Sequence, residues 1–336
     1  MARVAQRTGK QLLTVGPIAD DLHKFRMVTA RGTPRELGHA LGMIGIERGY
    51  PFPAVPAQQR ERNASIVALY REIDPAYLER VAGLAEAYGR KIEDVDLAVT
   101  EAFYFSQMGA DGYGMHKPEE TAFPECSIVA THASAGRTVV GRNLDTTNET
   151  RFLERSEVEG SYKSLNTGML AFHEYVLDGI NEKGLFIGEM SIVDATFGTN
   201  PVWFLRDLWH FFLADASGDF ALVEWSRDRE LAVTRQHGGA LVSANTSLIE
   251  GREKLMQEWR YAFADKYIAE KGADGIATHT SMAELMKRMS FRADNPVVPI
   301  IIGTMATVWT STYDLADRTM VIRYWEDGYK EHRLGF

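Results

Sequence analysis

The feature that most constrains this chain is a change of pattern at Cys126. Before it, apolar residues recur at the three- to four-residue spacing of amphipathic helices. From Cys126 onward, apolar and polar residues mostly alternate, and turn residues interrupt the alternation, which is typical of antiparallel strands. Strand runs punctuated by helices indicate an α+β protein with mainly antiparallel sheets rather than a doubly wound parallel sheet.

The helices of the front segment can be placed from their ends. Residues 33–36, Thr-Pro-Arg-Glu, form a capping box with proline in the first helical position, and they predict a helix that stops at Gly49. Asp74 precedes a proline in the same manner and opens a second helix that ends at Gly89. A third helix is expected over residues 95–105.

Residues 108–125 are rich in glycine and charge and have no helical or strand period, so we expect an exposed linker there. Beyond it, we expect a helix over residues 250–271 and another that begins at Ser281. The sequence predicts three hairpins, formed by 126–133 with 137–145, 210–215 with 220–225, and 304–314 with 318–326.

Composition excludes several classes of protein. The chain has 336 residues and can bury a substantial core, and its net charge of −9 repels phosphate backbones and anionic lipid surfaces. We therefore expect no nucleic-acid partner. No run approaches the roughly 18 apolar residues of a membrane span, and no secretory leader is visible, so a cytoplasmic protein without membrane association is expected. A single cysteine and nine scattered histidines predict neither a disulfide nor a metal site, and no cofactor motif is found.

The first hairpin places a charged segment beside the sulfur of Cys126. A two-residue turn would set Cys126 opposite Asp145, and a four-residue loop would set it opposite Asn143. In either register the sequence GRNLD, residues 141–145, lies next to the thiol. A guanidinium such as that of Arg142 lowers the pKa of a nearby thiol and favours the nucleophilic thiolate.

A lone cysteine in an apolar strand is usually a small buried hydrophobe, and that interpretation stays open. Three features favour chemistry instead. Cys126 is the first residue of the expected sheet, it follows a linker directly, and it separates a helical segment from a strand-rich one. A chain cut at this point would begin with cysteine, and its α-amine, with an ordinary pKa of about 8, would serve as the base for its own thiol. No histidine partner would then be needed.

The motifs resemble a known family. Cys126 followed by Ser-Ile-Val-Ala, GRNLD at 141–145 and GINEKGLFIGEM at 179–190 are similar to the choloylglycine hydrolase and penicillin V acylase group of N-terminal-nucleophile (Ntn) hydrolases. GTPRELGHALG at 32–42 resembles the self-processing branch typified by acyl-coenzyme A:6-aminopenicillanate acyltransferase. The resemblance continues through residues 213–225, 241–247 and 305–325.

This resemblance implies a four-layer αββα sandwich and a zymogen that cuts itself between Glu125 and Cys126. Residues 1–125 would be a helical pro-segment, retained as an α chain or excised, and residues 126–336 the catalytic β chain. In the fungal acyltransferase a glycine precedes the nucleophile, whereas Glu125 follows Pro124 here. This departure implies slow or absent self-cleavage.

The resemblance also implies roles for individual residues. Cys126 would be both the cleavage residue and the catalytic nucleophile, Asp145 would hold the new α-amine, and Arg142 would steady the thiolate and the substrate. Asn245 would supply an oxyanion-hole donor, a contribution worth a factor of about 10²–10³ in rate. Arg252 matches the second arginine of the family.

The expected reaction is the hydrolysis of a linear amide through a thioester on Cys126, with transfer of the acyl group to an amine as a second outcome. The partners would be a small-molecule acyl amide or acyl thioester and the α and β chains of one precursor, and a homo-oligomer is compatible with this scheme. Two alternatives remain. One is a non-processing binding or structural protein on the same fold, and the other is a Cys-His protease that uses His132 or His173 as its base.

Overall fold

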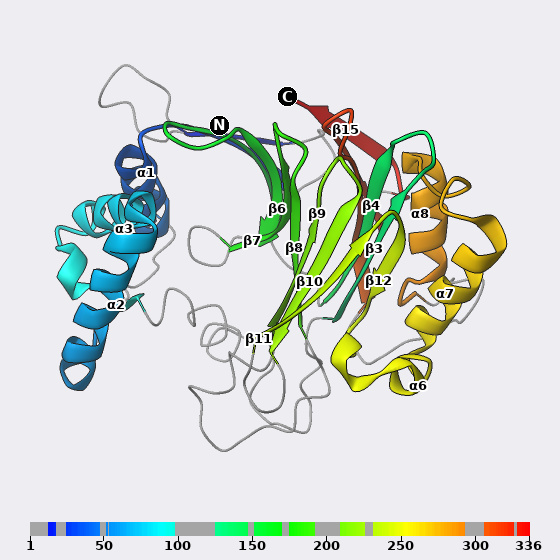
Figure 1. Cartoon of the computed structure of the whole chain (residues 1–336). Helices are drawn as coiled ribbons and strands as arrows, with labels where there is room; N and C mark the ends of the chain where they lie inside the picture. Colours follow the sequence, from blue (N-terminus) through cyan, green and yellow to red (C-terminus); the bar gives the residue numbers. More distant parts are fainter. Residues whose placement is uncertain are drawn as a thin grey trace. The chain divides into compact units, whose positions relative to one another are not determined.

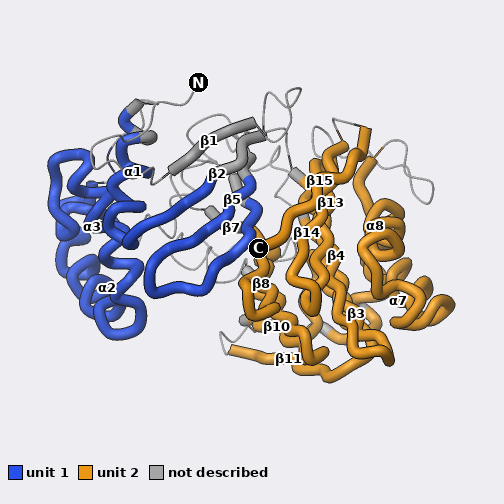
Figure 2. The backbone as a smooth tube through the Cα atoms, turned by 90° about the horizontal axis from the view of Figure 1, so that it is seen from above, with its two compact units in different colours: residues 1–121, 149–176 blue, residues 122–148, 177–336 orange. Residues whose placement is uncertain are grey.

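Helices and mainly antiparallel strands build the chain, so the expected α+β class is confirmed (Figure 1). The computed structural model describes residues 13–17, 25–47, 52, 54–97, 125–146, 151–169, 175–191, 209–225, 231–292, 306–325 and 328–336. The chain separates into two compact units, residues 1–121 with 149–176 and residues 122–148 with 177–336 (Figure 2). All site residues discussed below belong to the second unit.

Helices and a small group of strands make up the described part of the first unit. Its helices are α1 (Pro34–Glu47), α2 (Arg60–Ile73) and α3 (Pro75–Ala87), with the short 3-10 helices η1 (Ala57–Gln59) and η2 (Ile92–Asp94). Its strands lie in the order β1 (Leu13–Pro17), β2 (Phe25–Gly32), β5 (Arg151–Val158) and β6 (Ser164–Met169). The pair β2–β5 is parallel, and the pairs β1–β2 and β5–β6 are antiparallel.

Both predicted helix starts in this unit are confirmed. The backbone N–H of Thr33 donates to Glu36 Oε2 at 2.9 Å, and the N–H of Glu36 donates to Thr33 Oγ1 at 3.2 Å, which completes the capping box of α1. The Asp74 carboxylate accepts from the N–H of Tyr77 at 3.1 Å at the start of α3. Helix α2 escaped prediction because it begins without a side-chain cap and buries only Asn63 and Val67.

Strands β1 and β2 were also not expected in a front segment that reads as helical. The expected helix over residues 95–105 and the linker 108–125 lie mostly outside the described residues. Within them, Val95 pairs with Ala54 in an isolated bridge, and Glu125 is the first residue of a strand. The parallel pair β2–β5 places residues 149–176 with the front segment, so the compact units do not divide at residue 125.

Two antiparallel sheets form the second unit. The first sheet has the order β12 (Gly239–Ser243), β3 (Glu125–His132), β4 (Thr138–Thr146), β13 (Ala306–Asp314), β14 (Thr319–Tyr324) and β15 (Glu331–Gly335). The second contains β7 (Tyr175–Asn181), β8 (Phe186–Ser191), β9 (Trp209–Ala214), β10 (Asp219–Trp225) and β11 (Leu231–His237). All three predicted hairpins are present, as β3–β4, β9–β10 and β13–β14.

The two sheets pack face to face, and helices cover the far side of the first one. Between the sheets, the rings of Phe186 and Tyr313 lie with their centroids 4.9 Å apart. On the other side, α7 (Trp259–Lys271) and α8 (His279–Arg288) cover β12, β3 and β4 (Figure 1). The buried cluster there contains Val129, Val139, Val242, Ala264, Met282, Leu285, Met286 and Met289. Sheet, sheet and helices are three layers of the expected sandwich.

Two helix predictions in this unit need correction. The expected helix over residues 250–271 is three pieces, namely η3 (Leu248–Glu250), α6 (Arg252–Leu255) and α7. It breaks because the carboxylate of Glu258 accepts from the N–H of Tyr261 at 2.7 Å and so caps a new helix. Helix α8 begins at His279 rather than Ser281, since Thr278 is its N-cap and its Oγ1 accepts from the N–H of Ser281.

Candidate active site

The register of the first hairpin fixes what surrounds Cys126. Cys126 pairs with Leu144, so the expected partners Asp145 and Asn143 are both wrong by one residue. The reason is the odd number of residues, 133–137, between β3 and β4. The N–H of Ala133 donates to the carbonyl of Arg137 at 2.9 Å, which leaves a three-residue loop, 134–136, that ends on Gly136 with φ of +78°. A loop of two or four residues would have given one of the two expected registers. Because strand residues alternate between faces, this shift decides which charged groups share the face of the sulfur.

Cys126 and Arg142 lie on the face that meets the second sheet. Arg142 pairs with Ile128, whose side chain lies against Gly188 of β8. The Nη2 of Arg142 donates to Cys126 Sγ at 3.2 Å and to the carbonyl oxygen of Glu189 at 3.1 Å. Cys126 is 3% exposed and Arg142 is fully buried. The predicted guanidinium beside the thiol is therefore present, in a site closed to solvent.

A buried carboxylate holds the guanidinium of Arg142 in place. Asp178 of β7 lies with its Oδ2 3.2 Å from Nη1 of Arg142, and both side chains are fully buried. The hydroxyl of Ser311 donates to the same carboxylate oxygen at 3.1 Å. The ion pair leaves Nη2 of Arg142 directed at the sulfur. Sequence reasoning missed Asp178, although a lone aspartate inside the apolar strand YVLDGIN was a usable signal.

The backbone of Cys126 is held from the other side. Its N–H donates to Oδ1 of Asn245 at 3.0 Å, and Nη2 of Arg260 donates to the same oxygen at 2.8 Å. The Nη1 of Arg260 donates to Asp145 Oδ2 at 3.1 Å and to the Cys126 carbonyl at 3.4 Å. Thr307 donates to the other oxygen of Asp145 at 2.5 Å. One buried guanidinium therefore connects Asp145, Asn245 and the nucleophile's main chain.

Arg252, the other arginine named from sequence, does not join this cluster. Its side chain is 68% exposed and pairs with Asp265 at 2.7 Å. Arg260 occupies the site instead, in the first turn of α7. Because residues eight apart on one continuous helix differ by only about 80° in direction, the expected unbroken helix offered no way to choose between the two arginines. The break before α7 separates them.

Burial, rather than Arg142, decides the protonation of the thiol. Removal from solvent raises the pKa of Cys126 to about 11, and the nearby guanidinium of Arg142 only partly offsets this. Arg142 lowers the pKa of the thiol as the sequence predicts, but in the unbroken chain burial outweighs this effect. The thiol is neutral near pH 7 and needs a base before it can attack.

This pKa predicts how the intact chain reacts with iodoacetamide. Since only the thiolate is alkylated, we expect the rate to rise about tenfold per pH unit from pH 8 and to level off only near pH 11. Cys126 is the only cysteine, so mass spectrometry of labelled protein reports this site alone. Arg142→Met should move the inflection to still higher pH. A plateau at or below pH 9 in the intact chain would contradict the assignment.

The protease alternative uses His132 or His173 as the base. Of these two, the structure describes His132, which lies too far from the thiol for that role. His132 lies six residues along β3 from Cys126, a separation of roughly 20 Å, and its Nδ1 lies 2.8 Å from Thr138 Oγ1. His173 lies outside the described residues.

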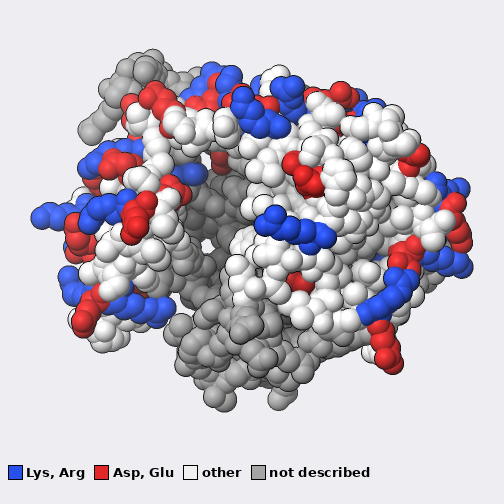
Figure 3. All heavy atoms as spheres, viewed as in Figure 1, with Lys and Arg blue, Asp and Glu red and all other residues white. Residues whose placement is uncertain are grey.

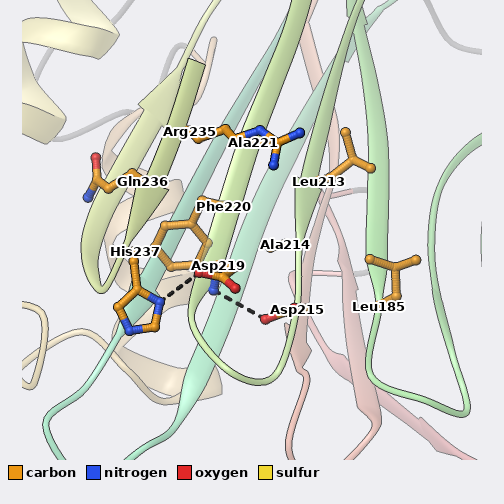
Figure 4. Close-up of a pocket in the computed structure, with 10 residues that line it drawn as sticks. All are labelled: Leu185, Leu213, Ala214, Asp215, Asp219, Phe220, Ala221, Arg235, Gln236 and His237. Atoms are coloured by element: carbon orange, nitrogen blue, oxygen red, sulfur yellow. Dashed lines mark hydrogen bonds and ion pairs between the residues drawn. The ribbon is translucent and has the colours of Figure 1, made fainter. Parts of the chain in front are cut away.

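A pocket of about 370 Å³ lies elsewhere on the second unit (Figure 4). It is lined from β9, β10 and β11 by residues that include Leu213, Arg235 and His237, and His237 Nδ1 lies 2.6 Å from Asp219 Oδ1. Leu213 pairs with Ile187, which is 45% exposed, so this is the outer face of the second sheet. The pocket does not include Cys126.

No helix among the described residues is long and apolar enough to cross a membrane, and no group of three potential metal-ligating side chains occurs among them. On the face drawn in Figure 3, basic and acidic side chains are interspersed.

No family model matches the chain, and no curated protein matches it. Solved structures do. One is penicillin V acylase from Agrobacterium tumefaciens, with a TM-score of 0.42, 15% identity, and 59% of this chain and 83% of that chain covered. Two altered forms of conjugated bile acid hydrolase from Clostridium perfringens give TM-scores of 0.45 and 0.44 at 15% identity, covering 63% and 62% of this chain and 92% of each of those chains.

These are the two kinds of protein that the sequence motifs resemble. At 15% identity, the roles of individual residues here follow from the contacts of this chain alone.

Proposed function

We propose that this chain is a self-processing cysteine Ntn hydrolase that cleaves linear amides through an acyl thioester on Cys126. One observation carries the proposal: two separate buried groups hold the sulfur and the main-chain nitrogen of the same residue. Arg142 donates to Sγ at 3.2 Å, and Asn245 accepts from the nitrogen at 3.0 Å. A structural cysteine needs neither contact, whereas a residue that uses its own amine as base needs both ends positioned.

Processing would use the same sulfur. Glu125 is the first residue of β3 and pairs with Asp145, and Cys126 pairs with Leu144. The peptide bond to be cut therefore joins two residues that both pair with β4. Sγ attacks the carbonyl carbon of Glu125, the C–N bond breaks, and the nitrogen takes the proton. Water then hydrolyses the thioester, which frees the Glu125 carboxylate and the α-amine of Cys126. That amine remains beside Asn245.

In each turnover the free α-amine takes the proton of the thiol, and Arg142 stabilises the thiolate through Nη2. The thiolate attacks the amide carbonyl, and the Asn245 side-chain amide supplies a donor for the oxyanion that forms. The α-ammonium returns its proton to the leaving amine. Water releases the acid, or an amine acceptor takes the acyl group, which is the transferase outcome.

The intact mass of purified, active protein tests the proposal. We expect two species, with the masses of residues 1–125 and 126–336. The burial of the thiol and its raised pKa favour the alternative, a non-processing binding protein on the same fold. A stable full-length mass in material without amide turnover would support that alternative and contradict the proposal.

A further inference from the structure

A second buried polar pair faces the layer between the two sheets and has no part in the mechanism above. His210 of β9 and Glu224 of β10 are both fully buried, with His210 Nδ1 3.0 Å from Glu224 Oε1. The contact lacks the geometry of a hydrogen bond, and in the described part of the chain neither ring nitrogen of His210 nor Oε2 of Glu224 has a hydrogen-bond partner. Three buried polar atoms without partners are costly to a fold.

Another buried histidine of the same unit shows that this situation is not forced on the fold. His279 is 9% exposed, its Nδ1 lies 2.8 Å from Thr312 Oγ1, and its Nε2 lies 2.9 Å from Thr319 Oγ1. Both nitrogens of His279 are therefore satisfied by protein groups. The contrast indicates that the described residues leave His210 without the partners that His279 has.

The pair lies close to Arg142, the residue that contacts the sulfur of Cys126. His210 pairs with Met190 on the neighbouring strand, and the residue before Met190 is Glu189, whose carbonyl accepts from Arg142. Adjacent strands are about 5 Å apart, so His210 lies one strand and one residue from the group that binds the guanidinium. The Cys126 side chain points into this same layer.

The pair also contacts the segment that carries Asn245, the residue that contacts the nitrogen of Cys126. Glu224 Oε1 accepts from the N–H of Leu248 at 3.0 Å, and Leu248 lies three residues after Asn245. His210 and Glu224 therefore lie between the segment that carries Asn245 and the strand that contacts Arg142. A substrate bound at Cys126 would lie in the layer between the two sheets, next to this pair.

The chemistry of the unpartnered atoms selects the ligand group. Burial lowers the pKa of His210 to about 3, so its ring is neutral, with one nitrogen donating and the other accepting. Oε2 of Glu224 is an acceptor when ionised and a donor when protonated, and burial raises the pKa of this carboxyl. A hydroxyl both donates and accepts and adds no charge to a buried layer, so it complements this set better than an ammonium or a carboxylate.

We propose that His210 and Glu224 form a specificity subsite that binds a hydroxyl group of the substrate beside Cys126. The inference rests on the proposed function, because it concerns the substrate of that reaction. It predicts that the natural amide carries a hydroxyl at a fixed distance from the scissile carbonyl. A plain aliphatic amide would leave the buried pair unsatisfied and would be a poorer substrate.

The test compares 4-nitroanilides of hexanoic acid and of its 2-, 3-, 4-, 5- and 6-hydroxy derivatives. For the wild-type protein we expect one isomer to exceed the plain hexanoyl compound by about tenfold or more in kcat/KM. In His210→Phe the ratio of that isomer to the plain compound should fall to about one. Glu224→Gln, which keeps an oxygen for the N–H of Leu248, should lower the ratio at least threefold and provides a second readout if the first variant does not fold.

His279→Phe is the matched control, because it removes a buried imidazole whose nitrogens already have protein partners. Its ratio should equal that of the wild type. The inference is overturned if no hydroxylated isomer is preferred by the wild type, or if the preference survives in both His210→Phe and Glu224→Gln. Complete absence of turnover on all six compounds, without acylation of Cys126, would instead overturn the proposed function.

Discussion

Replacing Cys126 with alanine should abolish both activities of the chain at once. The sulfur is the only nucleophile in the proposed scheme, so we expect amide turnover to fall by about 10⁵–10⁶-fold and the bond before residue 126 to stay intact. Initial rates with a chromogenic amide and the intact mass of the same preparation measure the two effects.

Cys126→Ser is the informative companion. It keeps a weaker nucleophile at the same position, so slow processing and slow turnover should persist. Unchanged folding of both variants, checked by far-ultraviolet circular dichroism, separates loss of chemistry from loss of structure. Cleaved or catalytically active Cys126→Ala protein would remove Cys126 from both roles.

Two arginines eight residues apart should differ sharply on substitution. Arg260→Met leaves Asp145 buried without its guanidinium and removes the donor that fixes Asn245, so we expect a loss of about 3–5 kcal/mol in the free energy of unfolding and a loss of turnover. Arg252→Met breaks only an exposed pair and should change stability by less than about 0.5 kcal/mol. Urea denaturation of both variants measures the difference.

Arg260→Lys provides a graded comparison. It keeps the charge beside Asp145 but loses the planar fork that reaches Asn245 and Asp145 together, so it should recover part of the stability and little of the turnover. Equal effects of the methionine substitutions at 252 and 260 would contradict the assignment of Arg260 to the site.

Local signals in the sequence predict the scaffold of the site well. The alternation from Cys126, the turn before Arg137 and the aspartate-proline and threonine-proline helix starts are each set by neighbouring residues. They locate β3, β4, α1 and α3 and place the GRNLD segment beside the sulfur. Asn245 also lies beside Cys126, where its Oδ1 accepts from the main-chain nitrogen, and its role as an oxyanion-hole donor stays a prediction.

The remaining site depends on tertiary contacts that no local pattern encodes. The three-residue loop moves the partner of Cys126 to Leu144, and a one-residue shift reverses which side chains share its face. Arg260 reaches the site because Glu258 caps a new helix. Asp178 follows Arg142 by 36 residues in the chain and contacts it only once the sheets have packed. Burial of the thiol outweighs the lowering effect of Arg142 on its pKa.

The most direct measurement is the mass of an acyl-enzyme trapped by acid quenching during turnover of a slow amide substrate. The account predicts that peptide mapping finds the acyl group on a peptide that begins with Cys126, bound as a thioester and released by hydroxylamine. An acyl group on any other residue, or on a peptide that still runs through Glu125 into Cys126, would contradict it.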